Sequence, residues 1–294
     1  MLIDYRYHIG SFVVVFIALL LGILIGIGLA PNPEELDRVV ADLKTEYRAA
    51  REAKEDELQA LREMNREHDM LVREAVSALI RDRLAGRRIA VILDHEMGRD
   101  PLAEDLRALL KQAGATITST TVFTHDFVAL PTEVRREVAR RLSLYPPPGV
   151  HFRTLIAQAL ARELAKGRPE LIRELHASGL LRSSADSDYR LAPEAALLVG
   201  GQSSPSDAAP ERIDLPMIQE LKSLGIRVVG CEPRDAAISC ISLYKASGIP
   251  TVDNADTPAG RLALVLALAG AEGHFGVKET ADRFLPDIPP SPGR

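Results

Sequence analysis

Residues 88–94 read RIAVILD, a short unbroken apolar run that ends on an acidic residue. Runs of this kind are typical of strands that are buried on both faces of a parallel sheet. A helical pattern covers residues 100–114, and residues 115–123 are rich in Thr, Val and Ile, which favours a second strand. The succession of strand, helix and strand predicts an α/β fold that begins at this run.

Strands and helices alternate again in the C-terminal part of the chain. We predict strands at 195–200, 226–232 and 249–253, and helices at 213–224, 238–246 and 257–269. Three helical patterns lie before them and look like an insertion, at 130–144, 152–166 and 169–178. A polar loop is predicted at 183–188. The α/β domain, residues 87–275, is thus a mostly parallel sheet with helices on both faces and a helical insertion. The remainder, residues 276–294, ends in a proline-rich stretch and is predicted to be a C-terminal tail.

Upstream of this domain the chain is dense in Glu, Arg, Lys, Ala and Leu. It contains no Gly or Pro between Pro33 and Leu84, which predicts one long helix. We assign residues 31–86 to a stalk built on this helix. A homodimeric coiled coil is the favoured interpretation, and a helix folded back on the globular domain is the alternative.

A heptad repeat can be laid on the stalk. One row holds Val40, Tyr47, Lys54, Leu61, His68 and Ala75, and the other holds Leu36, Leu43, Ala50, Glu57, Met64, Leu71 and Ala78. Most of these residues are apolar, as the seam of a coiled coil requires, with breaks at Lys54, Glu57 and His68. Because the seam is imperfect, both interpretations of the helix stay open.

Residues 9–30 read IGSFVVVFIALLLGILIGIGLA and carry no charge. The run reaches the length of about 20 apolar residues that a helix needs to cross the hydrocarbon core of a bilayer. We predict a transmembrane helix in contact with membrane lipid, preceded by an N-terminal tail at 1–8. A cleaved signal peptide is the alternative, since residues 28–30 have a small-x-small pattern. The run is longer than the usual apolar region of a signal peptide, which favours an anchor.

Gly22 and Gly26 form a GxxxG pattern within this run. Such a pair lets two membrane helices pack closely, although glycine is also common in membrane helices for other reasons. The sequence features that indicate orientation in the membrane conflict with each other. The Lys/Arg count favours the domain inside the cell, whereas the very short tail resembles a signal anchor and favours the domain outside the cytoplasm. We expect a single-pass protein of the cell membrane with an extracytoplasmic C-terminal domain.

The composition excludes several classes of protein. The net charge is −5 and Trp is absent, so we expect no nucleic-acid partner. Two cysteines are too few for a disulfide scaffold or a four-cysteine zinc site. The glycine-rich nucleotide motifs, the GxSxG elbow and the HExxH zinc motif are all missing. We therefore predict that the chain is not an enzyme.

Polar residues at the carboxyl ends of the predicted strands are the candidates for a ligand-binding crevice, because ligands of open α/β sheets bind there. The candidates are Asp94, His95, Gly200, Gly201, Glu232 and Asp253. An alternative is that these are ordinary polar residues of strand ends.

Cys231 and Cys240 are candidate ligands of a soft metal such as Cu(I), candidate partners in a disulfide, or small buried hydrophobic residues. Met64 and His68 share one face of the stalk helix, and their spacing is also that of seam positions.

Both ends of the chain carry a distinctive pattern. Tyr7-His8 precedes the run SFVVVFIAL at 11–19, with Gly22 and Gly26 beyond it, and PTVDNADTPAG occupies 250–260. The closing residues are Gly273, Gly276, Lys278, Ala281, Leu285 and Pro286. Together with the order of anchor, coiled coil and α/β domain, these features resemble the MctB-type copper transporter family of bacterial envelope proteins, over nearly the whole chain.

The resemblance implies a role in copper homeostasis, with copper as the ion handled, and an envelope location. It also links the chain to a family with members tied to envelope and division functions. One apolar helix whose only polar side chain is Ser11 does not line an ion pathway by itself, so we expect no pore. The residues alone favour a different role, a dimeric envelope or cell-division scaffold that presents its α/β domain to an envelope protein partner.

Overall fold

The computed structural model describes residues 5–29, 33–94, 101–201 and 210–289. Two compact units divide the chain, Met1–His68 and Asp69–Arg294. The first unit holds α1 (Tyr5–Leu29) and most of α2 (Pro33–Ile80). In the described part of the chain, one helix is long and apolar enough to cross a membrane, over Gly10–Gly28. The predicted N-terminal apolar helix is thus confirmed.

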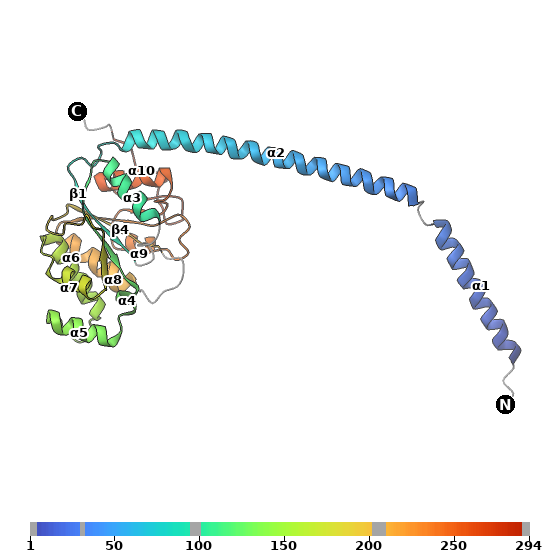
Figure 1. Cartoon of the computed structure of the whole chain (residues 1–294), viewed down its shortest axis with the longest axis horizontal. Helices are drawn as coiled ribbons and strands as arrows, with labels where there is room; N and C mark the ends of the chain where they lie inside the picture. Colours follow the sequence, from blue (N-terminus) through green and yellow to red (C-terminus); the bar gives the residue numbers. More distant parts are fainter. Residues whose placement is uncertain (1–4, 30–32, 95–100, 202–209, 290–294) are drawn as a thin grey trace. The chain divides into compact units, whose positions relative to one another are not determined.

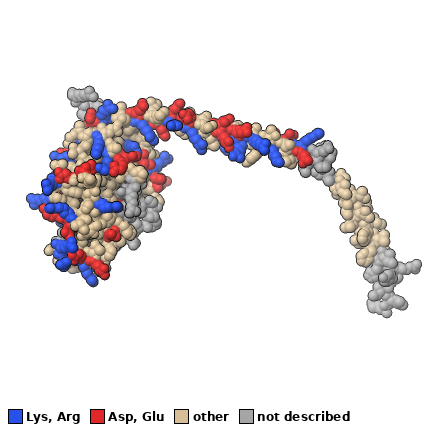
Figure 2. Space-filling view, viewed as in Figure 1, with Lys and Arg blue, Asp and Glu red and all other residues tan. Residues whose placement is uncertain are grey.

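The long helix is confirmed as well. α2 runs for 48 residues without a break, or about 72 Å at 1.5 Å per residue. Acidic and basic side chains alternate along it, whereas the stretch Gly10–Gly28 of α1 carries no charged side chain (Figure 2). The last turns of α2 belong to the second unit, where Val76 and Ile80 join the core of the domain.

The domain is built on a seven-stranded sheet of order β3-β2-β1-β4-β5-β6-β7. The strands are β1 (Arg88–Leu93), β2 (Thr116–Phe123), β3 (Leu181–Ser183), β4 (Ala195–Val199), β5 (Arg227–Cys231), β6 (Thr251–Val252) and β7 (His274–Phe275). All neighbours are parallel except β3, which is antiparallel to β2. The prediction of a mostly parallel α/β sheet is confirmed.

Helices cover both faces of the sheet (Figure 1). α3 (Pro101–Gln112) and α10 (Pro258–Ala269) pack on one face with the end of α2. The other face carries the remaining helices, α4 (His125–Ala129), α5 (Thr132–Leu142), α6 (Phe152–Lys166), α7 (Glu170–Ala177), α8 (Pro210–Ser223) and α9 (Ile241–Ala246). α4 to α7 lie between β2 and β3. Of these, α5, α6 and α7 correspond to the three predicted helices of the insertion, whereas α4 was not predicted.

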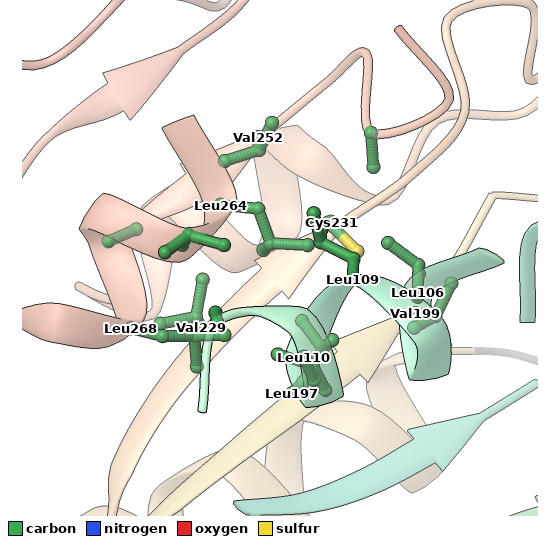
Figure 3. Close-up of a cluster of buried hydrophobic side chains, with 14 of the residues drawn as sticks. Leu106, Leu109, Leu110, Leu197, Val199, Val229, Cys231, Val252, Leu264 and Leu268 are labelled. Carbon is green, nitrogen blue, oxygen red and sulfur yellow. The ribbon is translucent and has the colours of Figure 1, made fainter. Parts of the chain in front are cut away.

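Side chains alternate between the two faces because the period of a strand is two residues. Val91 and Leu93 of β1 pack with α3 and α10, whereas Ile92 packs in the cluster of the opposite face. Both clusters consist of buried, mainly aliphatic side chains. Figure 3 shows leucines of α3 and α10 meeting Leu197 and Val229. This double burial explains the unbroken apolar runs of the central strands.

The two edge strands, β3 and β7, are not predicted from the sequence. β3 is three residues long and begins just before the predicted polar loop, and β7 is two residues long. Edge strands this short are set by pairing with a neighbour rather than by their own composition. The start of α8 also differs from the prediction, since the helix begins at Pro210 instead of 213.

Pro216 lies inside α8 and cannot donate a hydrogen bond to the carbonyl of Arg212. The hydroxyl of Thr154 donates to that carbonyl instead, at 3.2 Å. The bond replaces the missing one within the helix and joins α8 to α6.

Candidate functional site

The strand register brings the predicted crevice residues to one edge of the sheet. Leu93 pairs with Val199, Val199 with Cys231, and Cys231 with Val252. The next residues along these strands, Asp94, Gly200, Glu232 and Asp253, therefore form a row. β1 and β4 are the neighbouring strands at which the strand order reverses, the usual ligand position in open α/β sheets.

Glu232 is completely buried, and both of its carboxylate oxygens are hydrogen-bonded. Ser239 donates its hydroxyl at 2.7 Å, and the backbone N–H of Cys240 donates at 2.8 Å. The ammonium group of Lys278 lies 2.5 Å from Oε1 and forms an ion pair whose lysine side chain is 22% exposed. A buried carboxylate is tolerated when it is paired and hydrogen-bonded in this way.

Asp253 is equally buried, and it accepts hydrogen bonds from two backbone N–H groups. The N–H groups of Val277 and Lys278 donate to its two oxygens at 2.8 and 2.9 Å. Gly276 makes this approach feasible, because a Cβ at that position would lie 1.9 Å from Oδ1 of Asp253. Lys278 thus binds two acids of the row, Glu232 and Asp253. The segment that begins at residue 276 therefore closes over the ends of β5 and β6.

A second polar group lies beside Gly200. A Cβ on Gly200 would come within 2.5 Å of the Tyr244 hydroxyl, which donates to Oδ2 of Asp214 at 2.7 Å. Burial raises the pKa of Asp214 to about 7, and the negative charges of Asp94 and Glu211 add to the rise. This carboxyl therefore titrates near neutral pH.

Gly201 and His95 are the two remaining candidates for the crevice. Gly201 has φ +91°, and a Cβ there would lie 2.9 Å from the Cβ of Ala236, so a glycine fits this turn. His95 lies outside the described residues. A carboxylate–imidazole pair of Asp94 and His95 therefore stays a prediction.

The two cysteines are free thiols that lie on opposite faces of the sheet. Cys231 sits among leucines and valines of β4, β5, α3 and α10 (Figure 3). Cys240 belongs to the other cluster, next to Gly200. Burial raises the pKa of the Cys231 thiol, and burial followed by the charge of Asp214 raises that of Cys240 to about 12. Thiols held protonated in this way are weak metal ligands.

Within the described ranges, no three His, Cys, Asp or Glu side chains gather closely enough to hold a metal ion. On α1, a Cβ at Gly22 or Gly26 would meet nothing within 4 Å, so this small-residue face is open.

Lys278, Tyr244 and Asp214 complete the site but were not among the candidates predicted for it from the sequence. Lys278 follows a strand of two residues, which is too short to produce a recognisable sequence pattern. Tyr244 and Asp214 lie within helices that are recognised in the sequence by their apolar residues, so their polar groups do not stand out.

Comparison with known proteins gives a consistent result. The model of the family described as "Copper transport outer membrane protein, MctB" matches residues 2–286. Proteins named "Copper transporter MctB" from Mycobacterium bovis and Mycobacterium tuberculosis are 24% identical to the chain over 311 residues. These matches cover 94% of the chain and 96% of each relative. The family is one of transport proteins rather than of enzymes.

Proposed function

We propose a role in copper homeostasis from the premise that this chain belongs to the MctB family of copper transport outer membrane proteins. In this proposal the chain is a single-pass membrane anchor for an extracytoplasmic α/β domain. It works as a copper binder or as an assembly partner of other envelope proteins, and it does not itself form a pore.

The observation that carries this proposal is the almost entirely apolar composition of α1 over Gly10–Gly28. The apolar stretch Gly10–Gly28 contains one polar side chain, Ser11, and the part of the chain that the structure describes offers no further helix of this kind. Ion pathways through membranes are lined by several polar or charged groups from packed helices. A single helix of this composition supports anchoring rather than conduction.

Copper titration of the full-length protein in lipid nanodiscs tests the proposal. Under anaerobic conditions and against a competing chelator, we expect stoichiometric Cu(I) binding. Vesicles that contain the protein should show the same copper flux as protein-free vesicles. Protein-dependent flux would overturn the anchor-and-binder role.

A variant with Cys231→Ser and Cys240→Ser serves to examine the two predicted thiol ligands. Because both thiols are buried and protonated, we expect its copper stoichiometry to equal that of the wild type. Loss of copper from a folded variant would instead assign the site to one or both thiols.

A second candidate function, a dimeric envelope scaffold, is favoured by the exposed apolar residues of α2. Leu43 is 65% exposed, Tyr47 71% and Leu61 43%, all at predicted seam positions. A helix of this length gains little from propensity alone and is usually stabilised by packing an apolar face. A second copy of α2 would supply that packing.

Mass measurement of nanodisc-embedded protein tests the scaffold. Leu43→Asp with Leu61→Asp should convert a dimer into a monomer. Ala49→Asp with Gln59→Asp changes the same helix outside the seam and should leave the dimer intact. A wild-type monomer at high micromolar concentration would eliminate this function.

A further inference from the structure

We propose that α2 pairs in parallel with α2 of a second copy, and that Met64 and His68 of both helices together form a binding site for one Cu(I) ion. The site rests on the proposed function, because copper binding and chain pairing are both premises of it. It names the residues that would bind the copper ion, which the proposed function leaves open. It also explains how a chain without a metal cluster within its described residues would hold copper.

The direction of pairing follows from the anchor. α1 ends at Leu29 and α2 begins at Pro33, so each stalk starts next to its own membrane segment. Two copies inserted in one membrane with the same orientation must run their stalks in the same direction. Equal residues then lie at equal heights, which is the register of a parallel coiled coil.

Residues that flank the seam are compatible with this register. In a parallel pair, each g position faces the e position of the next heptad on the partner. Glu46 then faces Arg51 of the partner subunit, an oppositely charged pair. From Val39 to Val72, no such pair joins like charges. The pairs are Val39 with Lys44, Glu46 with Arg51, Ala53 with Leu58, Ala60 with Asn65, and Glu67 with Val72.

Met64 and His68 occupy consecutive layers of the seam. Four residues separate them, or about 6 Å along the helix axis. Helical side chains lean toward the N-terminus, so the His68 ring extends toward the layer of Met64. Both residues are exposed in the single chain, with Met64 at 47%, so pairing is free to bring them together.

Pairing doubles this set to two thioethers and two imidazoles around the helix–helix axis. Thioether sulfur selects Cu(I), and imidazole is also a copper ligand. Zn²⁺ prefers thiolate, imidazole and carboxylate, so a site with two thioethers discriminates against it. Leu61 and Leu71, which precede and follow the pair in the heptad rows, are apolar.

The proposal also explains a defect in the heptad pattern. A polar residue at a seam position lowers the stability of a coiled coil. His68 interrupts the seam between apolar layers, and a bound Cu(I) ion would offset the loss by joining the two helices.

The experiment uses full-length protein in nanodiscs, with Cu(I) added anaerobically against a competing chelator and the mass measured in the same sample. The wild type should bind one Cu(I) per two chains. In Met64→Leu with His68→Leu, both seam positions become apolar, so the dimer should persist while copper affinity falls at least tenfold. X-ray absorption of the wild type should show sulfur and nitrogen ligands.

Met70→Leu with His151→Gln is the matched control, because it removes one thioether and one imidazole outside the seam. It should bind copper as the wild type does. Undiminished copper binding by the Met64 and His68 variant would overturn this site but leave the proposed function standing. A dimer that binds no copper at all would overturn both the site and direct copper binding, and a monomeric wild type would overturn the pairing.

Discussion

The ammonium group of Lys278 lies 2.5 Å from Oε1 of Glu232, and the two residues are 46 positions apart in the chain. The backbone N–H of the same lysine donates to Asp253 at 2.9 Å. One residue of the segment that follows β7 therefore binds the acids at the ends of two neighbouring strands. This arrangement makes the closing segment part of the fold rather than an appendage of it.

Lys278→Met should destabilise the domain strongly. The change leaves the carboxylate of Glu232, which is wholly buried, without its counter-charge. Removal of one partner of a buried pair costs roughly 3–5 kcal/mol of unfolding free energy. Trp is absent, so unfolding in urea is best followed by the labelling of the two buried cysteines.

Two further variants separate the charge from the packing. Adding Glu232→Gln to Lys278→Met removes the unpaired charge and should recover part of the loss. Arg283→Met breaks the exposed pair of Arg283 with Asp287 and should change stability by less than about 1 kcal/mol. Equal losses in Lys278→Met and Arg283→Met would contradict the structural importance of the buried pair.

The sequence predicts the positions of the strand-end acids but not the group that neutralises them. Asp94, Gly200, Glu232 and Asp253 each follow an apolar run, and parallel strands bring such positions to one edge. Lys278 is brought there by β7, which has two residues and is recognisable only by its pairing with β6. Local patterns therefore locate one side of the site, and long-range pairing supplies the other.

The stalk, too, is predicted in part by local sequence and depends in part on contacts with a distant surface. Composition alone predicts α2, because a run of good helix formers without Gly or Pro has few alternatives. Which partner covers its exposed leucines depends on a second surface, so the heptad pattern predicts pairing but does not identify the partner.

Gly200→Ala should be destabilising because of one identifiable atom. The added methyl group would lie 2.5 Å from the hydroxyl of Tyr244, which overpacks a buried site and costs roughly 1–3 kcal/mol. In a Tyr244→Phe background that hydroxyl is gone, so the cost of the alanine should be smaller. A double-mutant cycle on urea unfolding measures this coupling. Strictly additive effects would show that the alanine is opposed by other atoms, such as those of Cys240.

Both thiols should resist alkylation in the folded protein. Cys231 and Cys240 are 0% and 2% exposed, and burial raises the pKa of each, so little thiolate is available at pH 8. Iodoacetamide should react with them only after urea unfolds the domain, and a Cys231→Ala variant distinguishes the two rates. Reaction of either thiol at the rate of a free cysteine in native buffer would contradict this burial.

Asp214 should make the stability of the domain depend on pH between about 4 and 7. Burial raises its folded-state pKa from 3.8 to about 7, with the charges of Asp94 and Glu211 adding to the rise and the hydrogen bond from Tyr244 opposing it. Between these values the folded state binds a proton that the unfolded state releases. The stabilisation is therefore complete below the unfolded pKa and is lost as the pH rises through about 7, by up to about 1.4 kcal/mol per pH unit.

Asp214→Asn isolates this contribution, because asparagine does not titrate and still offers a carbonyl to the Tyr244 hydroxyl. The difference in unfolding free energy between the variant and the wild type should move in favour of the variant as the pH rises from about 4 to 7, and then level off. Urea unfolding of both proteins at several pH values measures that difference, in which the titration of groups that do not interact with Asp214 cancels. Parallel stability curves across this range would mean that Asp214 ionises in the folded protein as it does in water.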